Sequence, residues 1–347
     1  MAQFRRDPII GQWVIVHIDD SWGPEQYKEE KHPLKQVATC QFCPGREHLT
    51  PPELDSVRPS GLGWKVRVVS NKFPALKIEG NIDRGHRGIL DFSNGIGAHE
   101  VVIETPDHLR NNLSDLTAEE IFDVIEKYQS RLIDLEKDRR FKYIVIFKNY
   151  GESAGTTLEH GHSQIIALPM VPKYVLEELR GAKTYFAKNN RCVFCDIIAQ
   201  EHQDKERIVV ENNHFIAFCP FVPRYPFECW ILPKGHSSNF ALITDEEQFS
   251  LAQALREVLV RLKKCLKDPS YNFYLHINPV NCEGPEAKEI LGNNGLDADG
   301  FSHFHWHMEI VPKLTQTSGF EWGTGFYVVR TAPHLAAKYL REITEKI

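Results

Sequence analysis

The sequence predicts an α+β fold made of two similar domains, each an antiparallel sheet with one main helix packed on it. Three observations lead to this prediction: the length of the chain, an internal repeat, and the order of strand-like and helix-like segments. At 347 residues the chain is too long for one ordinary core and suits two domains of about 150 to 200 residues. We place the boundary in the polar stretch before the second cysteine pair, which gives domains of residues 1–180 and 181–347.

The internal repeat is visible as the same order of segments in both halves. A Cys-x-x-Cys pair comes first, as CQFCPGRE from Cys40 and as CVFCDIIA from Cys192. Strand-like segments follow, RVVSNKFPAL in one half and RIVVENNHFIAF in the other. Each copy then reaches a histidine, at the end of HEVVIETPDH (His108) and of ECWILPKGH (His236). Self-similarity of this kind indicates that one structural unit occurs twice.

A long amphipathic helix is expected after each of these histidines. The segments that begin at Leu113 and Leu242 open with Ser, Thr and Asp residues and an acidic first turn, and then repeat apolar residues at helical spacing. A β-branched and aromatic strand follows each helix, at Tyr143–Asn149 and at Asn272–Asn278. A histidine cluster leads into the last strand of each copy, as HGHSQIIALP and as HFHWHMEIVP.

The composition excludes several classes of protein. Hydrophobic residues make up 42% and charged residues 25%, which is typical of a globular chain. No apolar run approaches the ~20 residues of a membrane helix, and the start MAQFRRDPII lacks the apolar core of a signal peptide. We therefore expect a cytoplasmic protein with no membrane partner. A net charge of -6 without a basic patch argues against nucleic acid as a partner.

Cysteines and histidines at matching places in the repeat predict two structural zinc sites. Cys and His are the usual ligands of tetrahedral zinc, and four protein ligands leave no position open for water. A redox role is disfavoured because neither cysteine pair opens a helix after a strand. The alternative is that these residues are ordinary parts of the core. The first site would comprise Cys40, Cys43, His108 and His160. The second would comprise Cys192, Cys195, His236 and one of His303, His305 or His307.

The segment HGHSQ predicts a nucleophile beside the first zinc site. Residues i and i+2 of an extended chain point to the same side, so His160, His162 and Gln164 project together. A nucleophilic histidine needs one free ring nitrogen, and a hydrogen bond at the other nitrogen sets the tautomer. With His160 on zinc, His162 would be the nucleophile on a rigid backbone. Gln164 would donate to a phosphate oxygen that gains charge during transfer.

The loop before this segment is a candidate phosphate site. Gly155 permits close approach of a phosphate, and the backbone and hydroxyl groups of Thr156 and Thr157 can bind it. Asn149, at the end of the preceding strand, is placed to contact a ribose or a base. The alternative for this loop is an ordinary tight turn.

Taken together, these motifs resemble those of the galactose-1-phosphate uridylyltransferases and their close relatives, the ADP-glucose phosphorylase-like proteins of the histidine-triad superfamily. The resemblance runs over nearly the whole chain, from FRRDPIIGQWVIV through CQFC, VVSNKFPAL, TPDH, FKNYGESAGTTLEHGHSQ and CVFC to YPFECWILPKGH and GFEWGTGFY. It implies two histidine-triad-like halves, in agreement with the repeat. It also implies a homodimer, His305 as the fourth ligand of the second site, and zinc or iron as the second metal.

The family implies a UDP-glucose:hexose-1-phosphate uridylyltransferase that works by a ping-pong mechanism. UDP-glucose would uridylylate His162 and release glucose 1-phosphate, and galactose 1-phosphate would then take the nucleotide. By the same resemblance, residues in several parts of the chain contact the base, the ribose and phosphates, and the hexose of the nucleotide sugar. These implied substrate-binding residues are Asn71, Phe73, Asn149, Gly155, Thr156, Thr157, Phe320 and Glu321.

Departures from the family pattern leave alternatives open. Many members carry an Arg-rich stretch where this chain reads HIDDSWGPEQYK, and the best-known uridylyltransferases have proline at the place of Gly161. The ending GFEWGTGFY is closer to the phosphorylase-like branch. One alternative is an ADP-glucose or dinucleotide phosphorylase that uses His162 with inorganic phosphate as acceptor. Another is a zinc-scaffolded nucleotide-binding protein without catalysis. A second catalytic centre with His305 as nucleophile is disfavoured, because no glycine-threonine loop precedes it.

Overall fold

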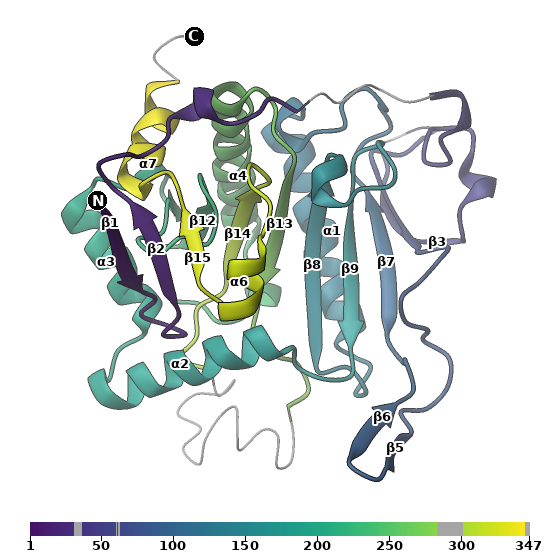
Figure 1. The fold of residues 1–347 in the computed structure, drawn as a ribbon. Coiled ribbons are helices and arrows are strands. Elements are labelled where there is room, and N and C mark those ends of the chain that lie inside the picture. Colours follow the sequence, from purple (N-terminus) through teal and green to yellow (C-terminus); the bar gives the residue numbers. More distant parts are fainter. Residues whose placement is uncertain (31–36, 60, 62, 283–300, 344–347) are drawn as a thin grey trace.

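A computed structural model describes residues 1–30, 37–59, 61, 63–282 and 301–343 of the chain (Figure 1). Its central feature is a ten-stranded antiparallel sheet that runs through both halves. From its edge inward, the first half contributes β3 (Glu53–Val57), β4 (Val66–Ser70), β7 (Ala98–Ile103), β9 (His162–Leu168) and β8 (Tyr143–Tyr150). The second half contributes β10 (Ile208–Glu211), β11 (Phe215–Phe218), β12 (Cys229–Pro233), β14 (His307–Pro312) and β13 (Tyr271–His276). The two orders match strand by strand, which confirms the predicted α+β class and internal duplication.

The two five-stranded units are joined into one sheet by their inner edge strands. Strands β8 and β13 pair antiparallel, with Tyr271 opposite Tyr150 and Asn272 opposite Asn149. The sequence suggested two sheets without indicating that they meet. Pairing these edges satisfies backbone N–H and C=O groups that two separate sheets would leave open.

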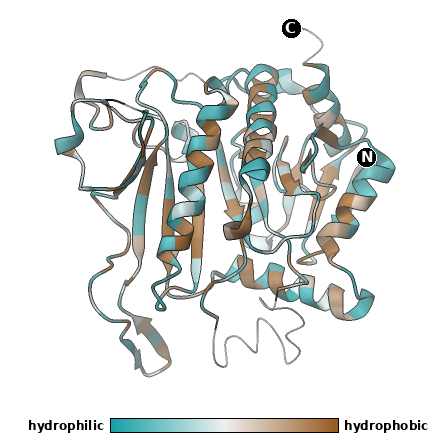
Figure 2. Cartoon of the chain, turned by 180° about the vertical axis from the view of Figure 1, so that it is seen from behind, coloured by the Kyte–Doolittle hydropathy of each residue, from teal (hydrophilic) through white to brown (hydrophobic). Residues whose placement is uncertain are grey.

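Two long helices cover one face of this sheet, as the view from behind shows (Figure 2). They are α1 (Ala118–Leu135) and α4 (Asp245–Leu266), one from each half. Each begins with a capping box, Thr117 with Glu120 and Thr244 with Glu247, at the helix starts expected from the sequence. Their apolar sides and the strand residues that face them form the main hydrophobic core.

The opposite face of the sheet carries the candidate site because side chains alternate along β9. Ser163, Ile165 and Ala167 are buried toward α1, and the Tyr128 hydroxyl donates to Ser163 Oγ over 2.7 Å. Their neighbours His162 and Gln164 must therefore point to the other face, away from the helices.

Strands from the two ends of the chain form a separate three-stranded sheet. It consists of β1 (Ala2–Arg6), β2 (Trp13–His17) and β15 (Tyr327–Val329), with β15 parallel to β2 (Figure 1). Val14 and Val16 pack against Val222, Val329 and Ala332. The first strands of the chain therefore pack on its second half.

The remaining elements surround these sheets. The helices are α2 (Lys173–Asn189), α3 (Val193–Asp204), α6 (Gly319–Thr324) and α7 (Pro333–Glu342), and β5 (Arg84–Arg87) pairs with β6 (Leu90–Ser93). Short 3-10 helices are η1 (Pro24–Gln26), η2 (Val37–Thr39), η3 (Glu47–Leu49), η4 (Leu113–Asp115), η5 (Glu152–Ala154) and η6 (Phe240–Leu242). The boundary expected between residues 180 and 181 falls inside α2. Cys192 caps α3, which follows a helix and not a strand. Among the described residues, none of the helices combines the length and apolar character needed to cross a bilayer.

The turn between β1 and β2 rests on α2 at a glycine. A Cβ atom built on Gly181 would lie 1.8 Å from the Ile9 carbonyl oxygen, far inside van der Waals contact. Gly181 therefore lets the N-terminal segment approach the helix backbone, at the cost of lower helix propensity.

Gly181→Ala is expected to lower the free energy of unfolding by about 1 to 3 kcal/mol, because the added methyl group forces the turn and the helix apart. Urea denaturation measures this loss. Gly323→Ala in α6 is the matched control, since a Cβ there meets nothing within 4 Å. The control should stay within about 0.5 kcal/mol of the unmodified chain. Equal effects of the two substitutions would contradict the close-packing interpretation.

Candidate active site and metal centres

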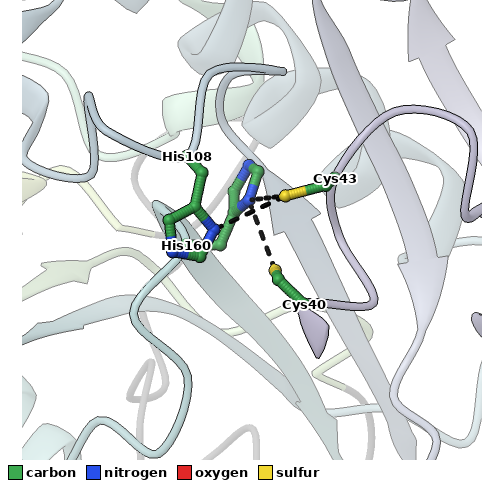
Figure 3. Close-up of side chains that lie close together, drawn as sticks. All are labelled: Cys40, Cys43, His108 and His160. Atoms are coloured by element: carbon green, nitrogen blue, oxygen red, sulfur yellow. Dashed lines mark hydrogen bonds between the residues drawn. The ribbon is translucent and has the colours of Figure 1, made fainter. Parts of the chain in front are cut away.

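The side chains of the first Cys/His set lie close together, with His160 two residues before the start of β9 (Figure 3). His160 Nδ1 is 3.5 Å from Cys40 Sγ and 3.7 Å from Cys43 Sγ, and His108 Nδ1 is 3.5 Å from Cys43 Sγ. All four residues are buried or nearly so, and their ligand atoms lie within 4.8 Å of one another. The chain thus brings together the four residues expected for the first metal site.

The second set is arranged in the same way in the other half. Cys195 Sγ is 3.4 Å from His236 Nδ1 and 3.7 Å from His305 Nδ1, and Cys192 completes the set. Of the three candidate histidines, His305 is the one whose ring joins the cysteines. Both of its nitrogens are engaged, since Nε2 donates to the Pro233 carbonyl over 2.9 Å. This arrangement leaves His305 no free nitrogen for the nucleophilic role considered above.

The spacing of these atoms fits a tetrahedral zinc ion. Zinc–sulfur and zinc–nitrogen bonds of about 2.3 and 2.0 Å at a tetrahedral angle separate the two ligand atoms by about 3.5 Å. The observed sulfur–nitrogen distances of 3.4 to 3.7 Å match this separation. His160 Nε2 also donates to the Thr105 carbonyl over 2.7 Å, which turns the Nδ1 lone pair toward the cysteines.

His307 belongs to a different buried group. Its Nε2 is 3.6 Å from Glu309, and Glu178 and His276 complete a set of four ligand-type side chains. His276 Nδ1 lies 2.7 Å from Glu178, while Arg224 and Tyr274 both contact Glu309. The positive charge of Arg224 keeps the pKa of Glu309 well below its usual range despite burial. His303 is buried beside Phe301 and is not part of either metal set.

A cavity of about 200 Å³ opens in front of His162 on the face of the sheet opposite α1. Five of the predicted site residues line it: Asn71, Phe73, Thr157, His162 and Gln164. Gln41 and Phe42, the two residues between the first cysteines, also line it, and the Phe42 ring lies 5.6 Å from that of His162. The segment between Cys40 and Cys43 therefore forms one wall of this cavity, which the spacing of the cysteines alone did not reveal.

The His162 ring is held in one orientation by its neighbour two residues back. Its Nδ1 lies 2.8 Å from the His160 carbonyl oxygen, which can only accept. Nδ1 therefore carries the hydrogen, and the lone pair is on Nε2. Burial and then the positive charge of Lys148 lower the pKa of His162 to about 4, so the ring is unprotonated at neutral pH. This is the protonation state that a nucleophilic histidine needs.

A fully buried ion pair supports the backbone of His162 from the helix side. Lys148 Nζ is 2.6 Å from Glu104 and donates to the His162 carbonyl over 3.1 Å. Burial raises the pKa of Glu104, and Lys148 opposes the rise. Neither residue stood out in the sequence, because each is a single charge within an apolar strand segment.

The other predicted residues are placed differently with respect to the cavity. Asn149 lies on β8 and accepts a hydrogen bond from Asn272 over 2.7 Å. Gly155 ends η5 in the left-handed conformation at φ 89°, and Thr156 donates to the Leu158 carbonyl. Phe320 and Glu321 are on α6, where Glu321 forms the capping box with Ser318. Neither α6 residue lines the His162 cavity among the described residues.

Two models of one protein family match this chain. The N-terminal domain of galactose-1-phosphate uridyl transferase matches residues 1–172, and the C-terminal domain matches residues 178–317. The chain belongs to the galactose-1-phosphate uridylyltransferase family. The resemblance seen in the sequence motifs is thereby confirmed, and the family's two domain models correspond to the two halves of the duplicated sheet.

Relatives within this family carry two different names. An ADP-glucose phosphorylase of Arabidopsis thaliana is 35% identical over 99% of this chain and 93% of its own length. A galactose-1-phosphate uridylyltransferase of Thermotoga maritima is 29% identical over the full length of both chains. The crystal structure of an Arabidopsis thaliana ADP-glucose phosphorylase with bound ADP-glucose has a TM-score of 0.79 at 34% identity, and covers 99% of both chains. A uridylyltransferase structure has a TM-score of 0.75 at 27% identity, with 100% of this chain and 99% of that one covered.

Lys148→Met is expected to lower the free energy of unfolding by about 3 to 5 kcal/mol, because Glu104 would be left buried without its partner. The double substitution Lys148→Met/Glu104→Leu should recover much of that loss. Lys137→Met, which removes one of the two ion-pair partners of the exposed Asp134, is the control and should cost less than about 1 kcal/mol. Denaturant unfolding of the four proteins measures these values. A double variant less stable than Lys148→Met would show that the pair is not the cause.

Proposed function

We propose that this protein is a nucleotidyltransferase that transfers a nucleoside monophosphate through a covalent bond to His162. The observation that carries the proposal is the tautomer of His162. Its Nδ1–H donates a hydrogen bond to the His160 carbonyl, which leaves the lone pair on Nε2 for attack on phosphorus. The cavity in front of the ring, with Gln164 and Thr157 on its wall, supplies donors for phosphate oxygens.

The reaction would proceed in two displacements at one phosphorus atom. Nε2 of His162 attacks the phosphorus that bears the nucleoside, a P–N bond forms, and the P–O bond to the sugar phosphate breaks. The sugar 1-phosphate leaves with that electron pair. An oxygen of the acceptor phosphate then attacks the same phosphorus, and the P–N electron pair returns to Nε2. Gln164 donates to an oxygen that gains charge in both steps.

The metal sites would be structural in this scheme. Each candidate site has four protein ligands, so zinc bound there has no open position and supplies rigidity rather than chemistry. In the first site the ion would fix His160, and His160 in turn presents the carbonyl that orients His162. The chain's own residues carry the transfer.

For the nucleotide, we propose ADP-glucose as donor and inorganic phosphate as acceptor. This choice is supported by the relative named ADP-glucose phosphorylase and by the similar structure with bound ADP-glucose. The arginine-free segment HIDDSWGPEQYK points the same way, because it lacks the Arg-rich stretch of many uridylyltransferases. The second candidate is a UDP-glucose:hexose-1-phosphate uridylyltransferase, which the full-length match to the Thermotoga maritima enzyme supports.

Incubation with ADP-glucose alone is expected to add one AMP group to the chain, and addition of phosphate should remove it as ADP. Intact-mass spectrometry distinguishes this adduct from the UMP adduct that UDP-glucose would give. His162→Ala should abolish the adduct, because His162 is the one histidine among the described residues that line the cavity. The variant should keep its metal, since His162 is not in the ligand set. Full turnover by His162→Ala would end the proposal, and an adduct only with UDP-glucose would select the second candidate.

The purified protein is expected to contain two zinc ions per chain, one for each Cys/His set. Cys40→Ser should lower the content by one, because a serine hydroxyl is a poor zinc ligand at neutral pH. Cys265→Ser is the matched control, as this cysteine belongs to neither set. Elemental analysis measures the stoichiometry. Zinc content that is unaffected by Cys40→Ser would contradict the assignment of the first site.

A further inference from the structure

His99 is a half-buried histidine that connects two residues of the cavity wall. It lies on β7, on the same face of the sheet as Gln164 of the neighbouring strand β9. Its Nε2 is 2.8 Å from Gln164 Oε1 and 3.0 Å from Asn71 Nδ2, and its Nδ1 accepts from the Ala75 backbone N–H over 3.1 Å. His99 itself is not among the residues that line the cavity.

These contacts determine where the hydrogen of the His99 ring lies. Nδ1 faces a backbone N–H group, which can only donate, so this nitrogen provides a lone pair. The ring hydrogen is therefore on Nε2. Asn71 offers Nε2 no acceptor, because the Asn71 Oδ1 atom already accepts from the Phe73 N–H over 2.9 Å. The Asn71 NH2 group, 3.0 Å from Nε2, can only donate, so with the hydrogen on Nε2 this approach is a contact and not a hydrogen bond. The acceptor that remains is the Gln164 carbonyl oxygen.

The orientation of the Gln164 amide follows from this bond. An amide has an acceptor end and a donor end that are nearly equal in size, and local hydrogen bonds decide which end points where. With Oε1 held by His99, the NH2 end of Gln164 is left for the cavity in front of His162. In the opposite orientation Gln164 would present an oxygen atom to the phosphate, which would repel the charge that develops there.

We propose that His99 is a positioning residue that locks the Gln164 amide with its donor toward the phosphate of the bound nucleotide. This inference rests on the nucleotidyl transfer proposed above. His99 touches no reacting atom in this scheme and acts through Gln164. The His99 ring is itself held by the backbone N–H of Ala75, in the loop after β4. The Phe73 N–H, which donates to Asn71 Oδ1, orders the same loop.

The second half of the chain provides an internal comparison. Glu309 occupies in β14 the position that Gln164 occupies in β9, and it is held by Arg224 and Tyr274. A carboxylate has no donor to present, and here its charge is already used by Arg224. In both halves a neighbouring side chain contacts the residue at this position, but that residue is an amide in the first half and a carboxylate in the second.

A purely structural role for His99 is the alternative, in which the ring only ties the loop after β4 to the sheet. Two substitutions separate these roles, because one retains the hydrogen-bond donor at the position of Nε2 and the other retains the acceptor at the position of Nδ1. His99→Gln places an amide nitrogen near the position of Nε2 and retains a donor for Gln164. His99→Asn places an amide oxygen near the position of Nδ1 and retains the acceptor for Ala75 only.

The rate of nucleotidyl-His162 formation with ADP-glucose, measured by rapid quench and intact mass in a single turnover, tests the proposal. His99→Asn is expected to slow this step on the order of tenfold to a hundredfold, below the full loss of an oxyanion donor. His99→Gln should be at least about fivefold faster than His99→Asn, and the nucleotide concentration at half-maximal rate should change less than the rate. Equal rates for the two variants, or a faster Asn variant, would overturn the proposal.

A double-mutant cycle with Gln164→Ala provides the second measurement. If His99 acts through Gln164, His99→Asn should have no further effect on the rate in the Gln164→Ala background. Independent, multiplicative losses would instead show a structural role and overturn the proposal. Zinc content and urea denaturation of each variant confirm that the fold is retained. Absence of any adduct on the unmodified chain with either nucleotide sugar would reject the proposed function itself, which is distinct from equal behaviour of the His99 variants.

Discussion

The candidate site depends on one hydrogen bond within the segment His-Gly-His, from His162 Nδ1–H to the His160 carbonyl. That carbonyl is fixed because the His160 ring is held from both sides, by the cysteine sulfurs at Nδ1 and by the Thr105 carbonyl at Nε2. Beneath it, Lys148 holds the carbonyl of His162. The backbone of His162, the proposed nucleophile, is therefore held in place before substrate binds, which would spare the reorganisation that a mobile ring requires.

The two halves of the sheet share the same arrangement of strands but differ in the side chains around the histidine that begins the β9 or β14 strand. Both contain a Cys/His set, and in both the histidine that begins the β-strand hydrogen-bonds to the carbonyl of the histidine two residues earlier, His162 to His160 and His307 to His305. His162 lines a cavity in the described part of the chain and has an amide, Gln164, two residues further along, whereas the residue two positions after His307 is a carboxylate, Glu309. In the second half the corresponding strand position belongs to Glu309, which lies in a buried group of charged and polar side chains with Glu178, His276 and His307.

Much of this organisation could be predicted from the sequence because it repeats or follows a short period. The Cys-x-x-Cys pairs, the histidines at matching places and the alternation of His160, His162 and Gln164 are local signals. The contact between His99 and Gln164 could not be predicted, since it depends on the register of two strands far apart in the sequence. The joining of β8 with β13, and the packing of the first strands on the second half, likewise depend on which edges meet.

The most direct test of this account is the identity of the nitrogen that carries the phosphorus. Phosphorus–nitrogen coupling in the NMR spectrum of 15N-histidine-labelled protein, recorded after treatment with ADP-glucose, would locate that bond. The account predicts one phosphoramidate at Nε2 of His162, with Nδ1 still protonated and hydrogen-bonded to the His160 carbonyl. A phosphorus atom on Nδ1, or on a histidine outside the β9 strand, would contradict it.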